Sequence, residues 1–292
     1  MEEKIKIIKK EDVCYPSLLK KIKNPPRVLY YIGQLPKKKE NCFAIVGTRM
    51  ASVYGKQVTF DFAQDLAEAG LIIVSGFAPG IDTFAHQATV ERKKRTIAVL
   101  GTGLDKKSIY PKSNLKLFEE ILKNNGCLIS EYPPGTRGTQ FTFPQRNRII
   151  AGISLGVLIV EAKEKSGSLI TANYAFEQKK KVFAIPGSIY SLNSKGCHYL
   201  IKKGAKLAEN ANDILKELKI KNLSKKESQN NEETAEEILI LSILREGALN
   251  IEKIIEKTKL PASTVASSLA ILEIKGKIRN LGGNTFSLSR QF

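Results

Sequence analysis

Short apolar runs alternate with longer amphipathic segments between residues 41 and 210. Apolar runs of four to six residues predict buried strands, and apolar positions three and four apart predict helices. The strands are predicted at 43–46, 71–74, 96–100, 127–130, 156–160 and 182–185. The helices are predicted at 54–69, 81–92, 114–123, 145–153, 168–180 and 194–203. Such alternation is typical of an α/β fold with a mostly parallel sheet covered by helices on both faces.

The chain outside this region is organised differently. Residues 1–40 form a short basic segment, and residues 219–234 are poor in apolar side chains and are predicted to be a linker. Residues 235–292 predict helices at 236–245, 251–258 and 263–275, the last with Ser263 as its N-cap. Two short strands around Gly282-Gly283-Asn284 complete the pattern of a small winged-helix domain. Its third helix lacks arginine and lysine until Lys275, so contact with protein or with another copy of the chain is as well supported as contact with DNA.

Composition narrows the classes of partner. The 292 residues carry a formal net charge of +18, which favours polyanions, although a lysine-rich surface also serves solubility. Four cysteines without CxxC spacing indicate neither a disulfide framework nor a zinc site, and we expect no metal and no other cofactor. The N-terminus lacks a secretory apolar region, and no uninterrupted apolar run of 18 residues occurs. We therefore expect a cytoplasmic protein without a membrane partner.

The segment 143–162 carries the strongest chemical signal. Arg146 and Arg148 flank Asn147 just before the buried strand at 156–160. After that strand, Ser166-Gly167-Ser168 has the form of a loop that opens a helix, where backbone amides favour an anion. Two arginines facing this loop across one strand favour phosphate as the ligand.

The first predicted strand ends in a second loop of this kind, Gly47-Thr48-Arg49. It matches neither the P-loop nor the dinucleotide fingerprint, but Arg49 and the amides of Gly47 and Thr48 can hold a phosphodiester. The alternative is that Arg49 pairs with a neighbouring carboxylate. Asp82 and His86 share a helix face, and a buried hydrogen bond between them is favoured over an acid–base or metal pair.

Many motifs in one order resemble the DNA-processing protein A family (DprA, also called Smf). They include IVGTR, SGFAPGIDTFAH, ISEYPPGT, FPQRNRIIAGIS, SGSLITA and FAIPG. The resemblance implies an extended Rossmann-like domain that binds single-stranded DNA, protects incoming DNA and helps load a RecA-type recombinase in natural transformation and recombination. It also implies a homodimer, a C-terminal winged helix and no enzymatic activity.

The predicted DNA-binding residues come from the phosphate-binding loops and from the family resemblance. Phe143 or Phe141 is interpreted equally well as a platform for an unpaired base and as a core residue. The set is Gly47, Thr48, Arg49, Ser52, Tyr54, Gly76, Gly80, Arg137, Gln140, Phe143, Arg146, Asn147, Arg148, Ser166, Gly167 and Ser168. No catalytic residue is predicted. The rival interpretation is a Rossmann-like nucleotide-processing enzyme of the phosphoribohydrolase kind. Its PGGxGTxxE motif is not matched by Pro133-Pro134-Gly135-Thr136, which lacks the paired glycines and the glutamate.

Overall fold

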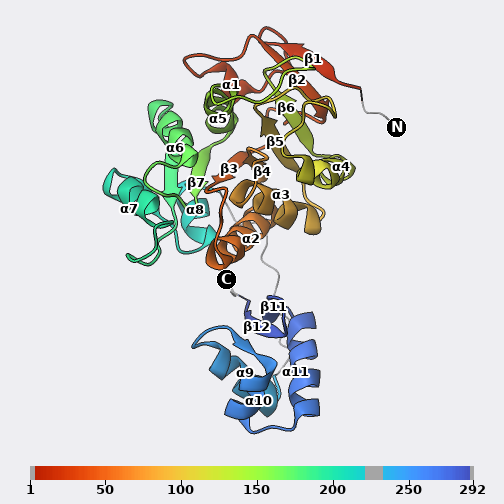
Figure 1. The fold of residues 1–292 in the computed structure, drawn as a ribbon, viewed down its shortest axis with the longest axis vertical. Helices are drawn as coiled ribbons and strands as arrows, with labels where there is room; N and C mark the ends of the chain where they lie inside the picture. Colours follow the sequence, from red (N-terminus) through yellow and green to blue (C-terminus); the bar gives the residue numbers. More distant parts are fainter. Residues whose placement is uncertain (1–3, 221–232, 290–292) are drawn as a thin grey trace. The chain divides into compact units, whose positions relative to one another are not determined.

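The computed structural model describes residues 4–220 and 233–289, which divide into two compact units within Met1–Lys225 and Lys226–Phe292 (Figure 1). Most of the predicted linker, residues 221–232, lies outside the described residues. Within the described ranges, no helix combines the length and the apolar character that crossing a membrane requires.

The first unit is built on a nine-stranded sheet in the order β1-β2-β6-β5-β4-β3-β7-β8-β9. Seven strands, from β3 to β9, run parallel to one another, which confirms the predicted mostly parallel sheet. The six predicted strands correspond to β3 to β8, and β9 was not predicted. These strands are β3 (Cys42–Val46), β4 (Ile72–Ser75), β5 (Thr96–Leu100), β6 (Cys127–Ser130), β7 (Gly156–Ile159), β8 (Lys181–Ala184) and β9 (Lys206–Leu207). The chain winds from β3 to β6 on one side and then crosses to β7 on the other side of β3.

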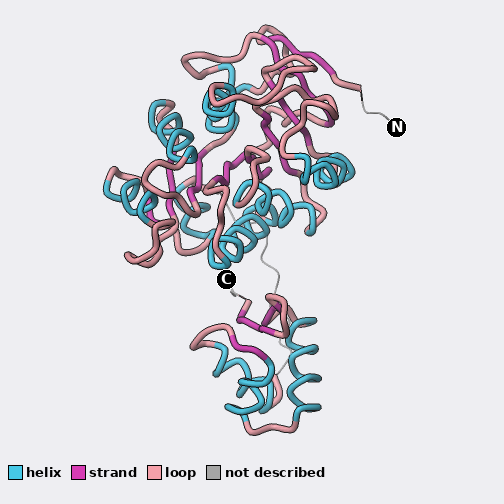
Figure 2. The backbone as a smooth tube through the Cα atoms, in the orientation of Figure 1, coloured by secondary structure: helices cyan, strands magenta, loops and turns pink. Residues whose placement is uncertain are grey.

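Helices cover both faces of this sheet, as Figure 2 shows in cyan. One face packs against α1 (Ser17–Lys20), α5 (Thr142–Ile153), α6 (Gly167–Glu177) and α7 (Lys195–Lys202). The opposite face packs against α2 (Val53–Glu68), α3 (Ile81–Glu91), α4 (Leu115–Lys123), which follows a short 3-10 turn at Lys112–Asn114, and α8 (Ala211–Glu217). Alternate residues of each strand enter opposite cores, because strand side chains point to the two faces in turn.

The basic N-terminal segment extends this sheet. Strands β1 (Lys6–Lys9) and β2 (Val28–Gly33) pair antiparallel with each other, and β2 pairs antiparallel with β6. Leu19 of the intervening α1 is fully buried against α5, so residues 6–33 share the core of the first unit. The sequence pattern predicted none of these three elements.

The second unit has the three helices and the hairpin that the sequence predicted. Its helices are α9 (Ala235–Leu244), α10 (Ile251–Thr258) and α11 (Ala262–Ile274), and its strands are β10 (Leu249–Asn250), β11 (Ile278–Asn280) and β12 (Thr285–Leu288). Helix α11 begins at Ala262 after Pro261 and has no side-chain cap. The predicted N-cap role of Ser263 is therefore wrong: Pro261 occupies the N-cap position, two residues earlier, and Ser263 lies in the first turn of the helix.

Candidate functional site

A cavity of about 610 Å³ opens at the carboxyl ends of the central parallel strands. The order of the strands reverses between β3 and β7, and ligands of open α/β sheets bind at such a switch point. The residues that follow β3 and β7, together with the start of α5, line the cavity. Of the predicted residues, it brings together Gly47, Thr48, Arg49, Gln140, Phe143, Arg146, Asn147, Ser166, Gly167 and Ser168.

The loop after β3 is anchored by the buried Glu161. Its carboxylate accepts hydrogen bonds from the Ser52 amide at 2.9 Å and the Ser52 hydroxyl at 2.6 Å, and its carbonyl accepts from the Thr48 amide at 2.8 Å. The Thr48 amide, one of the two amides expected to hold a phosphate, is thus already engaged within the protein.

Arg49 is exposed at the edge of the cavity. Its guanidinium carbon lies 5.4 Å from the centroid of the Phe143 ring, close enough for a cation–π contact. Among residues 4–220 and 233–289, no carboxylate lies within ion-pair distance of Arg49. The alternative of an internal salt bridge is therefore not realised in the structure, and the positive charge remains accessible.

Arg146 has the opposite environment, although it also lines the cavity. It is 4% exposed, and its guanidinium donates to the carbonyl oxygens of Gly76 and Val99 and to the side chain of Asn147. Burial lowers the pKa of Arg146 to about 10, so the group stays cationic at neutral pH. Burial raises the pKa of the nearby Asp82 carboxyl, an effect that the Arg146 charge opposes. Arg146 thus supports the floor of the cavity.

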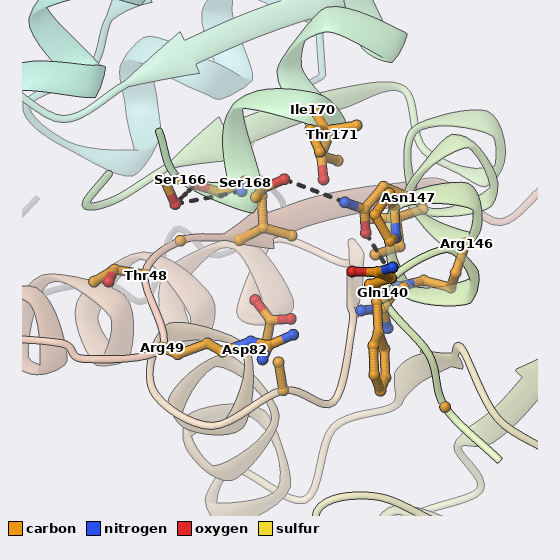
Figure 3. A pocket seen from close by; sticks show the side chains of 18 of the residues that line it. Thr48, Arg49, Asp82, Gln140, Arg146, Asn147, Ser166, Ser168, Ile170 and Thr171 are labelled. Carbon is orange, nitrogen blue, oxygen red and sulfur yellow. Dashed lines mark hydrogen bonds between the residues drawn. The ribbon is translucent and has the colours of Figure 1, made fainter. Parts of the chain in front are cut away.

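The serine loop faces Arg49 and Asp82 across the cavity (Figure 3). Ser166 caps α6, and its hydroxyl lies 2.8 Å from that of Ser168. The Asn147 amide donates to the Gly167 carbonyl at 3.2 Å, which ties α5 to this loop. The first turn of α6 therefore meets the cavity with hydroxyl groups and the positive end of a helix dipole.

Six predicted residues lie outside the lining of this cavity. Arg148 points elsewhere and forms an ion pair with Glu131 at 2.6 Å. Ser52 and Tyr54 secure the loop and α2, the latter by donating to the Pro186 carbonyl at 2.9 Å. Arg137 is exposed in the segment that precedes α5.

The remaining two are glycines at points of close contact. Gly76 gives its carbonyl oxygen to Arg146 beneath the cavity. Gly80 has φ +79°, and a Cβ built there would lie 2.4 Å from the Thr48 carbonyl oxygen. The loop before α3 can therefore pack against the loop after β3 only because residue 80 has no side chain.

The predicted hydrogen bond between Asp82 and His86 is not formed. His86 Nδ1 lies 2.7 Å from the Thr96 hydroxyl, and His86 Nε2 is buried without a partner in the structure. The Thr96 hydroxyl donates to the Ile73 carbonyl, so it accepts from Nδ1–H and fixes that tautomer. Burial, reinforced by the Arg146 charge, lowers the pKa of His86 to about 3.

Two residues of this site were missed by sequence reasoning. Lys163 is exposed and lines the cavity, and Glu161 organises the loop after β3. Both follow β7 within four residues, and charged residues close behind a buried parallel strand are the signal that could have identified them. Within the described residues, no group of three or more His, Cys, Asp or Glu side chains is arranged to hold a metal ion.

Comparison with known proteins adds independent findings. The family model of DNA recombination-mediator protein A matches residues 6–219, and that of the DprA winged helix domain matches residues 224–284. The DNA processing protein DprA of Streptococcus pneumoniae is 48% identical over 206 residues, which cover 70% of this chain and 72% of that protein.

Two solved structures are similar as well. The X-ray structure of the Streptococcus pneumoniae protein aligns with a TM-score of 0.69 at 45% identity, covering 73% of this chain and 74% of the other. DNA processing protein A from Helicobacter pylori, studied for its single-stranded DNA binding mode, aligns with a TM-score of 0.65 at 32% identity. That alignment covers 74% of this chain and 96% of the other.

Proposed function

The chain belongs to the DNA recombination-mediator protein A family, and from this premise we propose that it binds single-stranded DNA in the cavity between β3 and β7. One observation carries the proposal: Arg49 is exposed, is free of carboxylate partners within the described residues, and lies 5.4 Å from the ring of Phe143. A cation beside a partly exposed aromatic ring matches the two repeating parts of a single strand, its phosphates and its unstacked bases.

The expected contacts follow from this arrangement. Arg49 pairs with one phosphate through charge-assisted hydrogen bonds. The Ser166 and Ser168 hydroxyls and the Lys163 ammonium hold a second phosphate at the start of α6. Phe143, whose ring also lies 5.8 Å from that of Tyr110, is half-buried and offers a rigid surface on which any base can stack. Binding that depends on backbone and stacking is independent of base sequence.

We propose that this binding is not coupled to catalysis. Asp82 is the carboxyl group that lines the cavity, and it is 6% exposed and packed against Gly76, where a Cβ would lie 2.5 Å from its Oδ2. A general acid or base must reach its substrate, whereas this group is held against the loop it stabilises. Incubation with nucleotides and with DNA should give no released base, no released phosphate and no strand cleavage.

The cellular role that we propose is the one the family resemblance implies. The protein, as a cytoplasmic homodimer, protects incoming single strands and helps load a RecA-type recombinase during natural transformation and recombination. The support is family membership over residues 6–219 together with the recombination-mediator description of that family. Sedimentation of the purified protein tests the dimer, and recombinase filament formation on protein-coated single strands tests the loading.

The binding function is tested by titrating labelled single-stranded and duplex oligonucleotides of equal length at several salt concentrations. We expect the single strand to bind more tightly than the duplex. The logarithm of its association constant should fall linearly with the logarithm of the salt concentration. Equal affinity for both forms, or an affinity insensitive to salt, would overturn the proposal.

A further inference from the structure

A second cavity, of about 420 Å³, lies between residues 18–24 and the C-terminal end of α6. Arg146 lines the first cavity and Arg148 lines the second. Residues two positions apart on a helix are rotated by about 200° about its axis, so these two arginines point to different sides and α5 separates the two cavities. We call this second site the α1–α6 cavity. It unites two features that the first cavity leaves unexplained, the basic N-terminal segment and Arg148.

Positive charge dominates the lining of the α1–α6 cavity. Lys21, Lys23 and Lys179 are exposed around it, and none of them has an ion-pair partner within the described residues. Glu177 is the acidic residue of the lining, and Glu131 neutralises part of the Arg148 charge. Three unpaired ammonium groups around one concave site strongly favour an anion.

Arg148 contributes a hydrogen-bond donor without a partner to the lining of the α1–α6 cavity. Its residue is 9% exposed, and one terminal nitrogen of the guanidinium is held by Glu131 at 2.6 Å. The other terminal nitrogen, Nη1, is buried and has no hydrogen-bond partner in the structure. Buried charged donors are rarely left unpaired, because the lost hydration is not replaced. Because Nη1 is closed to solvent, an anion in the cavity would act on it through its negative charge, which balances the buried donor.

The walls of the cavity are held in place by the core. A Cβ at Gly152 of α5 would lie 2.6 Å from Leu19 of α1, so the two helices are in direct backbone-to-side-chain contact. The Tyr15 hydroxyl donates to the Pro26 carbonyl at 2.7 Å and fixes the segment that carries Lys21 and Lys23. Lys180 donates to the carbonyls of Ala151 and Gly152 at the end of α5 and to that of its C-cap residue, Ser154. The site is thus formed before any ligand arrives.

We propose that the α1–α6 cavity is a second anion site that binds a phosphate group with Lys21, Lys23, Lys179 and Arg148. The phosphate comes either from a free polyphosphate or from a nucleic-acid strand that continues beyond the first cavity. The second source rests on the proposed function, whereas the first does not. A guanidinium and several ammonium groups suit both, because each phosphate offers several acceptor oxygens.

The test uses the full-length protein and two probes, inorganic pyrophosphate and a labelled oligothymidylate, measured by titration calorimetry and by fluorescence. The site variant is Lys21→Gln/Lys23→Gln/Lys179→Gln, which keeps side-chain length and removes three charges. The matched control is Lys94→Gln/Lys116→Gln/Lys123→Gln, whose three lysines are exposed and line neither cavity. Melting temperatures of all variants confirm that each is folded.

We expect the site variant to bind pyrophosphate about tenfold more weakly or worse, and the control to bind as the parent does. If pyrophosphate binding is unchanged but oligothymidylate affinity falls in the site variant alone, the phosphate belongs to a strand, and the proposal stands. If the site variant binds both probes as tightly as the parent and the control, the proposal is overturned. Arg49→Ala separates the two sites: loss of pyrophosphate binding in the lysine variant, with no effect of Arg49→Ala on oligonucleotide binding, would leave this site valid and refute the proposed function.

Discussion

At the scale of single residues, arginines that look alike in the sequence have three different roles. Arg146 is buried and donates to main-chain carbonyls, so its charge supports the fold. Arg148 is held by Glu131 on the far side of the same helix. Arg49 is exposed beside an aromatic ring and is available to a ligand. The number of accessible donors, rather than the number of arginines, determines which residue can bind phosphate.

Arg49→Ala is expected to weaken single-stranded DNA binding by about ten- to a hundredfold, the effect of losing a charge-assisted contact of about 1.5–3 kcal/mol. The melting temperature should stay within about 2 °C of the parent, because the side chain has no internal ion pair within the described residues. The control is Arg27→Ala, which removes an exposed arginine that lines neither cavity. A large loss of melting temperature with unchanged affinity per folded molecule would refute the assigned role.

His86 predicts a pH dependence of stability. Burial lowers its pKa from 6.5 to about 3, so the unfolded chain binds a proton at this residue between those pH values and the folded chain does not. The contribution of neutral His86 to the free energy of unfolding is therefore present above pH 6.5. As the pH drops well below 6.5, this contribution falls by about 1.4 kcal/mol per pH unit. Urea unfolding between pH 7 and pH 5 measures the slope. His86→Asn, which has no titrating group, should give a shallower slope, and parallel curves would contradict the buried neutral histidine.

At the scale of elements, the strongest repeating patterns gave correct predictions. Strands β5 and β6 begin and end where the apolar runs predicted, because both faces of a central parallel strand are buried. Strand β1 was missed because it has a single buried residue, Ile8, at the edge of the sheet, which leaves no recognisable period. Helix α1 is one turn long and depends on packing against α5 rather than on its own pattern.

The candidate site could be predicted in its loops but not in its internal pairings. Gly47–Arg49 and Ser166–Ser168 were found because glycine and serine follow apolar strands, and parallel strands bring their carboxyl ends to one edge. Glu161 could not be paired with Ser52 in advance, because 109 residues separate them in the sequence. Whether an amide or a guanidinium is free depends on such distant partners.

Gly80→Ala tests how the loop before α3 positions the loop after β3. Its φ of +79° disfavours any side chain, and the new Cβ would lie 2.4 Å from the Thr48 carbonyl oxygen and 2.6 Å from that of Arg49. We expect a loss of on the order of 2–4 kcal/mol in unfolding free energy and weaker DNA binding through displacement of Arg49. Gly70→Ala is the control, with φ +92° and no atom within 4 Å, and should cost about 1–2 kcal/mol with unchanged affinity. Equal effects of Gly80→Ala and Gly70→Ala on DNA affinity would contradict the proposal that Gly80 positions the loop carrying Arg49.

At the scale of the whole molecule, the first unit holds both cavities and the accessible cations that line them. The two sites share α5, whose RNR segment presents Arg146 to one cavity and Arg148 to the other. A DNA strand that occupies both cavities would contact the protein on two sides of one rigid helix. The number of its phosphates that the protein neutralises would then set the salt dependence of binding.

The second unit is expected to contribute little to this affinity. Helix α11 has no lysine or arginine from Ala262 to Ile274, and its exposed side chains include Ser263, Ala266 and Ser267. A neutral helix face releases no counterions from a phosphate backbone. A chain truncated after residue 220 should therefore bind a single strand within about twofold of the full-length protein, with the same logarithmic salt slope. Circular dichroism and melting of the truncated chain establish that it is folded. A tenfold loss of affinity with a shallower slope would show that the winged helix itself binds DNA.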